Sequence, residues 1–161
     1  MHSAPHNQRR LRRRRRTPDI EVVLAVPALR HNHPRRLADL ALHADRLRLP
    51  PGRTLVHAGR TARELVVIVA GQAAVLRGSG ATAVLRAGAQ IGGDEVIRRE
   101  RHAATVVTTT EVEVVVVDGP AVVWAHQEGL VDRFGAPAAV TDAPPARRPD
   151  VDPHPPARLA S

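Results

Sequence analysis

The stretch QIGGDEVIRRERHAATVV, residues 90–107, combines residue types that suit an anionic ligand. Gly92 and Gly93 are adjacent, and glycine lets a backbone approach a ligand more closely than any other residue does. A short turn of helix after such glycines presents free backbone N–H groups, and its dipole favours an anion. The pattern therefore looks like a phosphate-binding turn, and a plain glycine turn between two strands is the alternative.

Other residues that carry chemistry are sparse. The sequence contains no cysteine, which excludes disulfides, thiolate nucleophiles and cysteine zinc sites and is typical of a reducing cytoplasm. His31, His33, His43 and His57 are of a type that binds zinc, nickel or copper, but no carboxylate cluster accompanies them. The sequence also has no serine nucleophile elbow, Walker sequence or paired-carboxylate motif. We therefore expect a cytoplasmic protein with no metal site and no enzymatic activity.

Positive charge is concentrated at the N-terminus. The chain of 161 residues has 24 basic residues, all arginine, and a formal net charge of +8. Residues 1–18 hold seven arginines and no acid, which leaves 17 basic against 16 acidic side chains, about +1, for the rest. Binding to nucleic acid or to an anionic surface is therefore expected only of this run, and a solvated run without a partner is the alternative. The candidate residues are Arg9, Arg10, Arg12, Arg13, Arg14, Arg15 and Arg16.

The composition divides the chain into three parts. A like-charged N-terminus cannot offset its ordering entropy by burial, so we expect residues 1–21 to be a disordered leader. Seven of the 14 prolines lie in residues 136–161, which predicts a disordered Pro-rich tail over residues 135–161. The apolar run of residues 20–29 is interrupted by an acid and is not expected to be a signal peptide, and no run reaches the ~18 residues of a membrane span. One domain remains, residues 22–134.

Within this domain, short apolar runs alternate with glycines. From residue 53 to residue 119 the runs are rich in valine and have no helix between them, which predicts an antiparallel sandwich or small barrel. Residues 119–127, GPAVVWAHQ, predict a closing helix. Residues 33–49 predict one amphipathic helix, because their apolar side chains recur at helical spacing. The apolar positions are Leu37, Leu40, Ala41, Ala44 and Leu47.

A helix, a Gly-punctuated set of strands and a closing helix resemble the cyclic-nucleotide-binding domain, as found in the cyclic AMP receptor protein and in protein kinase A regulatory subunits. The resemblance covers about residues 22–127. It rests on the PPG turn at residues 50–52, on Gly71 after a strand, and on the motifs LRAGAQIGG and RHAATVV, which follow those that open and close the family's phosphate-binding cassette. It implies a mainly β fold, an antiparallel β-roll of jelly-roll type with flanking helices.

The resemblance also implies which side chains hold a cyclic nucleotide. In the family a Glu after the second-position Gly accepts the ribose 2′-hydroxyl, and an Arg before the Ala-Ala-Thr pairs with the phosphate. This sequence has Gly93 and His102 at those positions. Asp94 and Glu95 are rotated by ~100° and ~200° around a helical turn, and Arg101 points to the opposite face of an extended backbone, so we do not expect them to substitute. The candidate ligand-binding residues are Gly92, Gly93, Asp94, Glu95, Arg101, His102, Ala103, Ala104 and Thr105.

We interpret the chain as a non-enzymatic, stand-alone module that senses a ligand or binds a partner, with weak or lost binding of cAMP and cGMP and no required cofactor. Its partner is then an unidentified protein or a small anionic ligand. The double change Gly93→Glu with His102→Arg is expected to gain affinity, and to gain more than either change alone. If His102 contacts an anion, binding is expected to strengthen as the pH falls through about 6.5. The alternative function is nonspecific binding of nucleic acid or an anionic surface through the leader.

Overall fold

The described part of the chain begins with three short helical segments. The computed structural model describes residues 19–135 and 139–140. Helix α1 spans Ile20–Leu24, the 3-10 turn η1 spans Pro27–Leu29, and helix α2 spans Pro34–Ala41. The Asp19 carboxylate caps α1. Pro34 fits the first position of α2, because a backbone N–H at that position would have no hydrogen-bond partner within the helix.

The strands of the described residues form two antiparallel sheets, with the orders β1-β8-β3-β6 and β2-β7-β4-β5-β9. Helix α3, Gly93–Arg98, lies between β6 and β7, and helix α4, Gly119–Gln127, follows β8. The strands are β1 Ala44–Leu49, β2 Thr54–Val56, β3 Glu64–Ala70, β4 Ala73–Arg77, β5 Gly80–Leu85, β6 Gln90–Ile91, β7 Thr105–Thr108, β8 Val112–Asp118 and β9 Ala139–Val140.

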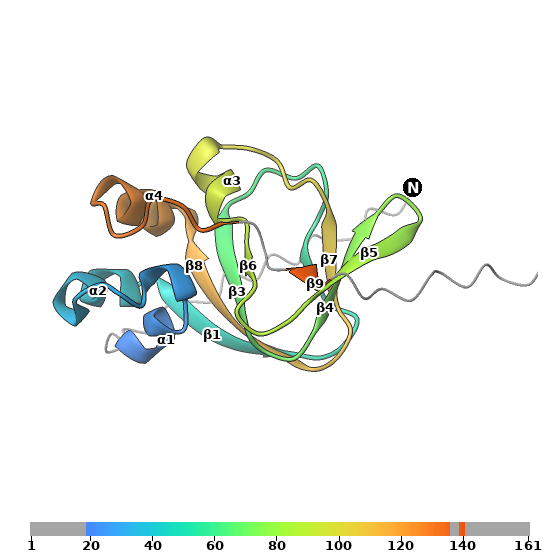
Figure 1. The fold of residues 1–161 in the computed structure, drawn as a ribbon, viewed down its shortest axis with the longest axis horizontal. Helices are drawn as coiled ribbons and strands as arrows, with labels where there is room; N and C mark the ends of the chain where they lie inside the picture. Colours follow the sequence, from blue (N-terminus) through green and yellow to red (C-terminus); the bar gives the residue numbers. More distant parts are fainter. Residues whose placement is uncertain (1–18, 136–138, 141–161) are drawn as a thin grey trace, which may run out of the picture.

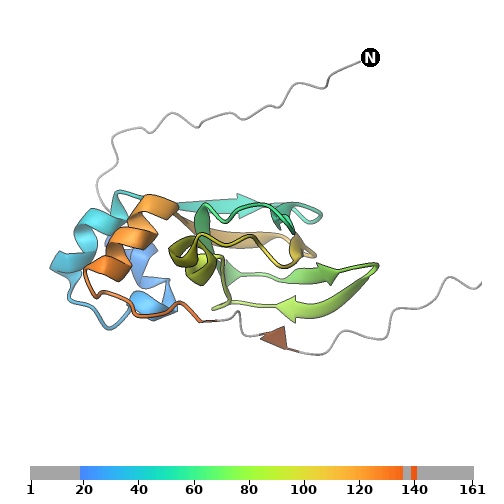
Figure 2. The ribbon, with the colours of Figure 1, turned by 90° about the horizontal axis from the view of Figure 1, so that it is seen from above.

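The first sheet is covered on both faces, which explains the unbroken apolar runs in β3 and β8. Because successive side chains of a strand point to opposite faces, Leu65 and Val67 pack against the helices, whereas Val66 and Ile68 pack inside the roll. Figure 1 shows helices α1, α2 and α4 on one side of this sheet and the second sheet on the other, and Figure 2 shows the same arrangement from above. The predicted antiparallel β-roll with flanking helices is confirmed.

The prediction of a single helix over residues 33–49 is wrong in its second half, because the chain turns after α2 and continues as β1. Leu47 fits both the helical spacing and a strand's alternation, and the strand pairing decides between them. Its neighbours Arg46 and Arg48 point to the other face, where both pair with Glu113 of β8. The closing helix was predicted with its observed bounds.

The predicted leader and tail lie largely outside the described residues. Helix α1 begins two residues before the predicted domain boundary. Val22, Val23, Val26 and Leu29 are buried beneath the first sheet. Within the predicted tail, β9 pairs with β5 through Ala139 and Val140, so this part of the tail adds an edge strand. Among the described helices none has the length and apolar character to span a membrane.

Gly71, between β3 and β4, gives a direct test of the strand packing. Its φ is +87°, and a Cβ added there would overlap the Glu111 carbonyl oxygen and lie 2.9 Å from the Val112 Cα. Backbone atoms of a sheet cannot move aside, so Gly71→Ala is expected to lower the free energy of unfolding by about 3 kcal/mol or more, measured by urea denaturation. The matched control is Gly78→Ala, which has a φ of +58° but open space around it. Equal losses in the two variants would contradict the close packing at Gly71.

Candidate functional site

The candidate cassette begins with a left-handed glycine. Gly92, with a φ of +87°, follows β6 and caps the N-terminus of α3. A Cβ at this position would lie 2.7 Å from the Glu64 carbonyl oxygen and 3.1 Å from Cε1 of His102. Both the backbone angle and the available space therefore require glycine, and the turn places His102 beside the start of α3.

Gly93 is also without room for a side chain. It is buried, and an added Cβ would lie 2.5 Å from Cγ and 2.7 Å from Cβ of Phe134. Phe134 is 4% exposed and belongs to the apolar cluster under the helices. At the position where the resemblance implies a ribose-binding glutamate, this chain has packed an aromatic ring of its own.

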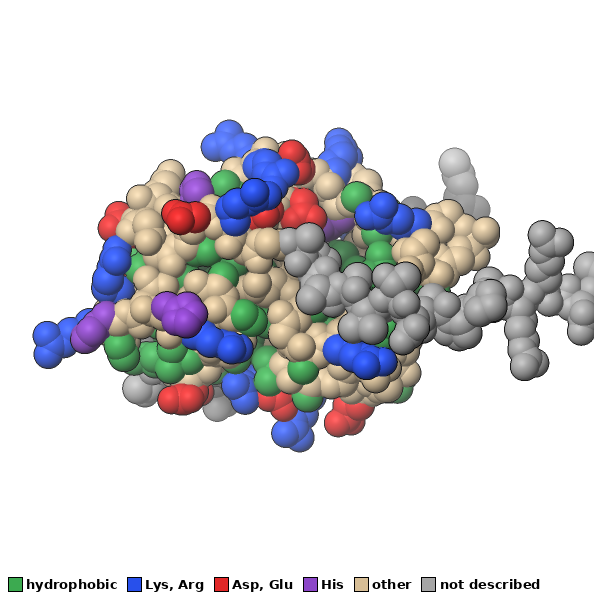
Figure 3. All heavy atoms as spheres, in the orientation of Figure 1, with side chains coloured by type: hydrophobic (Ala, Val, Ile, Leu, Met, Phe, Trp, Pro, Cys, Tyr) green, Lys and Arg blue, Asp and Glu red, His purple; other side chains and the backbone are tan. Residues whose placement is uncertain are grey.

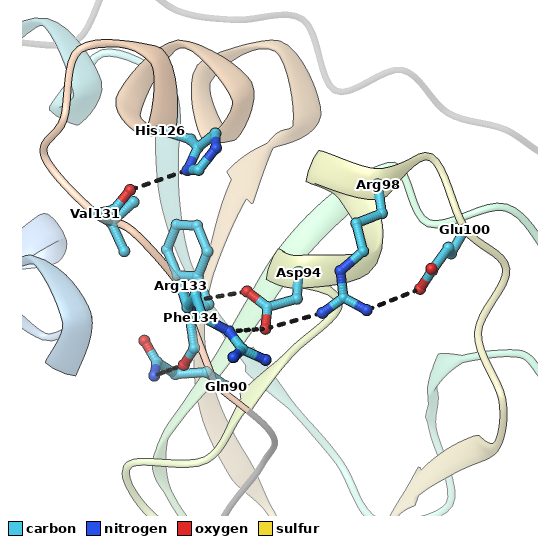
Figure 4. Close-up of polar contacts among 8 residues, drawn as sticks. All are labelled: Gln90, Asp94, Arg98, Glu100, His126, Val131, Arg133 and Phe134. Atoms are coloured by element: carbon cyan, nitrogen blue, oxygen red, sulfur yellow. Dashed lines mark hydrogen bonds and ion pairs between the residues drawn. The ribbon is translucent and has the colours of Figure 1, made fainter.

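Asp94 is directed at the C-terminal end of the domain (Figure 4). Its Oδ1 accepts a hydrogen bond of 2.8 Å from the backbone N–H of Phe134. Its Oδ2 lies 3.5 Å from Arg98 and 3.9 Å from Arg133. The carboxylate thus holds residues 130–134, here called the strap, against α3.

Two further predicted site residues bind the chain itself. Arg101 donates a hydrogen bond of 2.7 Å to the Gly59 carbonyl oxygen. The Thr105 hydroxyl accepts a hydrogen bond of 3.0 Å from the N–H of Ala58. Both contacts fix the loop before β3 against the cassette. Of the remaining candidates, Glu95 and Ala104 are half-buried and Ala103 is exposed.

His102, at the position where the resemblance implies a phosphate-binding arginine, is only 9% exposed. Its backbone N–H donates to the Arg60 carbonyl oxygen, and its own carbonyl accepts from Gly59. Burial lowers the pKa of the imidazole below its usual 6.5, and the negative charge of Glu95 opposes this shift only in part. Near neutral pH the ring is uncharged, and any protonation on meeting an anion begins from a pKa below the 6.5 expected from the sequence.

The lowered pKa of His102 predicts a pH dependence of stability. Below pH 6.5 the unfolded chain takes up a proton at this histidine that the folded chain does not, so the free energy of unfolding falls as the pH drops from 6.5 toward the folded pKa. In His102→Gln this part of the pH dependence is expected to disappear. Urea denaturation of both proteins between about pH 7.5 and 5.5 measures the difference, which isolates this residue from the other histidines. Parallel pH profiles would show that the imidazole is not held neutral by burial.

A surface hollow of about 380 Å³ lies on the outer side of α3, between α3 and α4. Its lining carries both signs of charge, and Figure 3 shows acidic and basic side chains intermingled over α3 on this face. No one-sign patch for an anion results. The lining residues are Asp94, Ile97, Arg98, His126, Asp132 and Arg133. The described residues contain no group of three or more His, Cys, Asp or Glu side chains suited to a metal ion.

Gln90 and Phe134 are site residues that the sequence pattern did not indicate. Gln90 donates a hydrogen bond of 2.6 Å to the Phe134 carbonyl oxygen, and its own side-chain oxygen accepts from the N–H of Ala28. Phe134 is the only phenylalanine in the chain, and an isolated large aromatic just after a helix is a usable sign of an anchored segment. Gly93, against which Phe134 packs, has no side chain and so gives no sign of this contact in the sequence.

Comparison with known proteins agrees with this geometry. The family profile described as the cyclic nucleotide-binding domain matches residues 46–128, more than half of the chain. No curated protein matches the sequence.

Solved structures give the same fold at low identity. The regulatory subunit of a cAMP-independent protein kinase A from Trypanosoma brucei is 19% identical over 70% of this chain and 43% of its own, with a TM-score of 0.59. A cyclic nucleotide-binding-like protein from Brucella abortus is 24% identical over 71% and 98%, with a TM-score of 0.56. The sensor domain of the transcriptional regulator DNR from Pseudomonas aeruginosa is 13% identical over 68% and 81%, with a TM-score of 0.60. The chain spans less than half of the kinase regulatory subunit. Since the profile match covers most of the β-roll and the cassette, the chain belongs to the cyclic nucleotide-binding domain family.

Proposed function

We propose that this protein is a regulatory interaction module without enzymatic activity, whose cassette has lost tight binding of cAMP and cGMP. The observation that carries the proposal is the contact between Phe134 and Gly93, where an added Cβ would lie 2.5 Å from the ring. A glutamate cannot be built there without displacing the strap. The fold itself is that of a ligand-sensing, regulatory domain.

The size of the expected loss follows from the two missing side chains. A hydrogen bond to a charged group contributes ~1.5–3 kcal/mol, so the absent glutamate and arginine together remove ~3–6 kcal/mol, or two to four decades of affinity. Even when protonated, His102 can direct only one of its two N–H groups at a phosphate, in place of a bidentate guanidinium, and burial disfavours its charged form.

One of the structural neighbours supports the idea that this fold serves regulation without cAMP. The Trypanosoma brucei regulatory subunit is described as part of a cAMP-independent kinase, and it shares the β-roll at a TM-score of 0.59. At 19% identity, what the two proteins share is the fold. The partner proposed for this chain is therefore a protein or a small anionic ligand other than a tightly bound cyclic nucleotide.

Calorimetric titration of the full chain with cAMP and with cGMP tests the proposal. We expect no dissociation constant in the micromolar range for either nucleotide, since relatives with both polar side chains would bind two to four decades more tightly. A folded protein, shown by a cooperative thermal transition, is the required control. A micromolar heat signal from either nucleotide would mean that the cassette binds despite Gly93 and His102.

A second candidate function rests on the seven arginines of residues 9–16, which lie outside the described residues. We propose nonspecific binding of polyanions by this run, with the β-roll as the folded carrier. We also propose that the protein is located in the cytoplasm, which the absence of cysteine favours.

A further inference from the structure

The strap leaves α4 through a glycine turn. Gly129 has a φ of +67°, and its backbone N–H donates a hydrogen bond of 3.1 Å to the His126 carbonyl oxygen. The backbone N–H of Leu130 donates a hydrogen bond of 2.9 Å to the Ala125 carbonyl oxygen. This pair of bonds ends the helix and redirects the chain. Beyond it, residues 130–134 belong to no helix or strand and form no other backbone–backbone hydrogen bond within the described part of the chain.

Side chains from four different places hold the backbone of the strap instead (Figure 4 draws three of the four contacts). Their distances lie between 2.6 and 3.1 Å, within the normal range for hydrogen bonds. Three side chains donate to carbonyl oxygens of the strap: Asn32 to Leu130, His126 to Val131 and Gln90 to Phe134. The Asp94 carboxylate accepts the fourth hydrogen bond, from the backbone N–H of Phe134.

The side chains of the strap divide into two sets. Leu130, Val131 and Phe134 are 4%, 6% and 4% exposed and pack into the cluster under the helices. Asp132 and Arg133 between them are exposed. Apart from the long contact of 3.9 Å between Asp94 and the Arg133 side chain, the polar contacts thus recognise main-chain atoms. The apolar contacts recognise two adjacent aliphatic residues and, after two intervening residues, an aromatic one.

Main-chain hydrogen bonds combined with pockets for spaced side chains are the means by which proteins bind extended peptides. We propose that the strap occupies a peptide-binding groove formed by α3, α4 and the loop before α2, and that a partner segment with the same aliphatic-aliphatic-x-x-aromatic spacing binds this groove when the strap leaves it. The strap, which belongs to the same chain as the groove, therefore competes with the partner segment for the groove.

This inference rests on the proposed function, because it names the partner class of the interaction module. The two fail separately, however. The nucleotide titration concerns the cassette's affinity for cAMP and cGMP, whereas the groove is tested with a peptide and by exchange of the strap's own amides.

Hydrogen exchange in the full wild-type chain is the first test, and it requires no substitution. The Phe134 amide is expected to exchange hydrogen at least about tenfold faster than the amides of β3 and β8. Its exchange rate is expected not to rise in low concentrations of urea, because a local opening of the strap exposes little new surface. Exchange of Phe134 only at the rate of global unfolding would show that the strap never leaves separately, and would overturn the proposal.

Peptide binding is the second test. In full-length Phe134→Ala the competing strap is weakened, so a labelled peptide EGLVDRFG, residues 128–135, is expected to bind at least about tenfold more tightly than to wild type. The same peptide with alanine for its phenylalanine is expected to lose at least about tenfold. Leu85→Ala is the matched control, because Leu85 is fully buried in the roll interior and its loss destabilises the fold without touching the strap.

Three results would overturn the groove as proposed. The first is a folded Phe134→Ala variant that binds no peptide at about 1 mM, a concentration comparable to that of a tethered competitor. The second is equal binding of the phenylalanine and alanine peptides, or equal gains in Phe134→Ala and Leu85→Ala. The third is a wild-type dimer that the peptide dissociates, which would assign the groove to the strap of a second copy.

Discussion

The triple variant Gly93→Glu, His102→Arg, Phe134→Gly is expected to bind cAMP about two to four decades more tightly than the wild-type chain. Glutamate and arginine supply two charged hydrogen bonds worth ~3–6 kcal/mol together, and the third substitution gives the glutamate room. Glycine is needed at position 134 because the Cβ of Phe134 is itself 2.7 Å from the Cβ position of residue 93. Calorimetric titration at neutral pH measures the gain.

The matched controls separate space from charge. Gly93→Glu with His102→Arg, in the presence of Phe134, is expected to gain much less affinity and to lose stability, because inserting atoms into a filled site typically costs ~1–3 kcal/mol. Phe134→Gly alone is expected to lose stability without gaining affinity. Equal affinity of the double and triple variants would show that Phe134 does not exclude the ribose-binding side chain, and no gain in a folded triple variant would show that the assigned positions are wrong.

The Val-rich runs bounded by glycine predicted an antiparallel sandwich or small barrel, and the resemblance to the cyclic-nucleotide-binding domain predicted the β-roll. Glycine was informative because it adopts left-handed turns that place a Cβ too close to its neighbours. Gly71 is a clear case, since its neighbours across the turn are backbone atoms. The Val-rich runs gave the strands, and their lack of alternation is explained only by the structure, which places β3 and β8 between two apolar clusters. Local pattern was insufficient at Leu47, which satisfies the spacing of a helix and of a strand.

The cassette was located from sequence, but its interior was not. Position along the chain identified Gly93 and His102 as departures from the family pattern, and it could not show that Phe134, 40 residues beyond Asp94, fills the space at Gly93. Contacts of that separation depend on how the strap folds back over α3, and the strap has no periodicity to reveal it. Likewise, the burial that lowers the His102 pKa comes from tertiary packing around the Gly92 turn.

Deleting residues 1–18 is expected to abolish binding to duplex DNA while leaving the thermal transition of the fold unchanged. The deleted residues hold seven arginines and no acid, and the rest of the chain is near neutral, at about +1 from 17 basic and 16 acidic side chains. For the wild-type chain, seven arginines neutralise up to seven phosphates, so log affinity is expected to fall against log salt with a slope as steep as roughly −6. Fluorescence anisotropy with labelled DNA at several salt concentrations measures both quantities.

Charge, rather than length, is the expected cause of this binding. A full-length variant with glutamine at Arg9, Arg10 and residues 12–16 is therefore the matched control, and it should lose DNA binding as completely as the deletion. Two DNA sequences of equal length should bind the wild-type chain equally, because a run of like charges presents no fixed hydrogen-bonding groups to base edges and the chain has only two aromatic residues for stacking on bases. Retention of binding by the deletion variant would instead place the nucleic-acid site on the β-roll, where the described face over α3 mixes acidic with basic side chains.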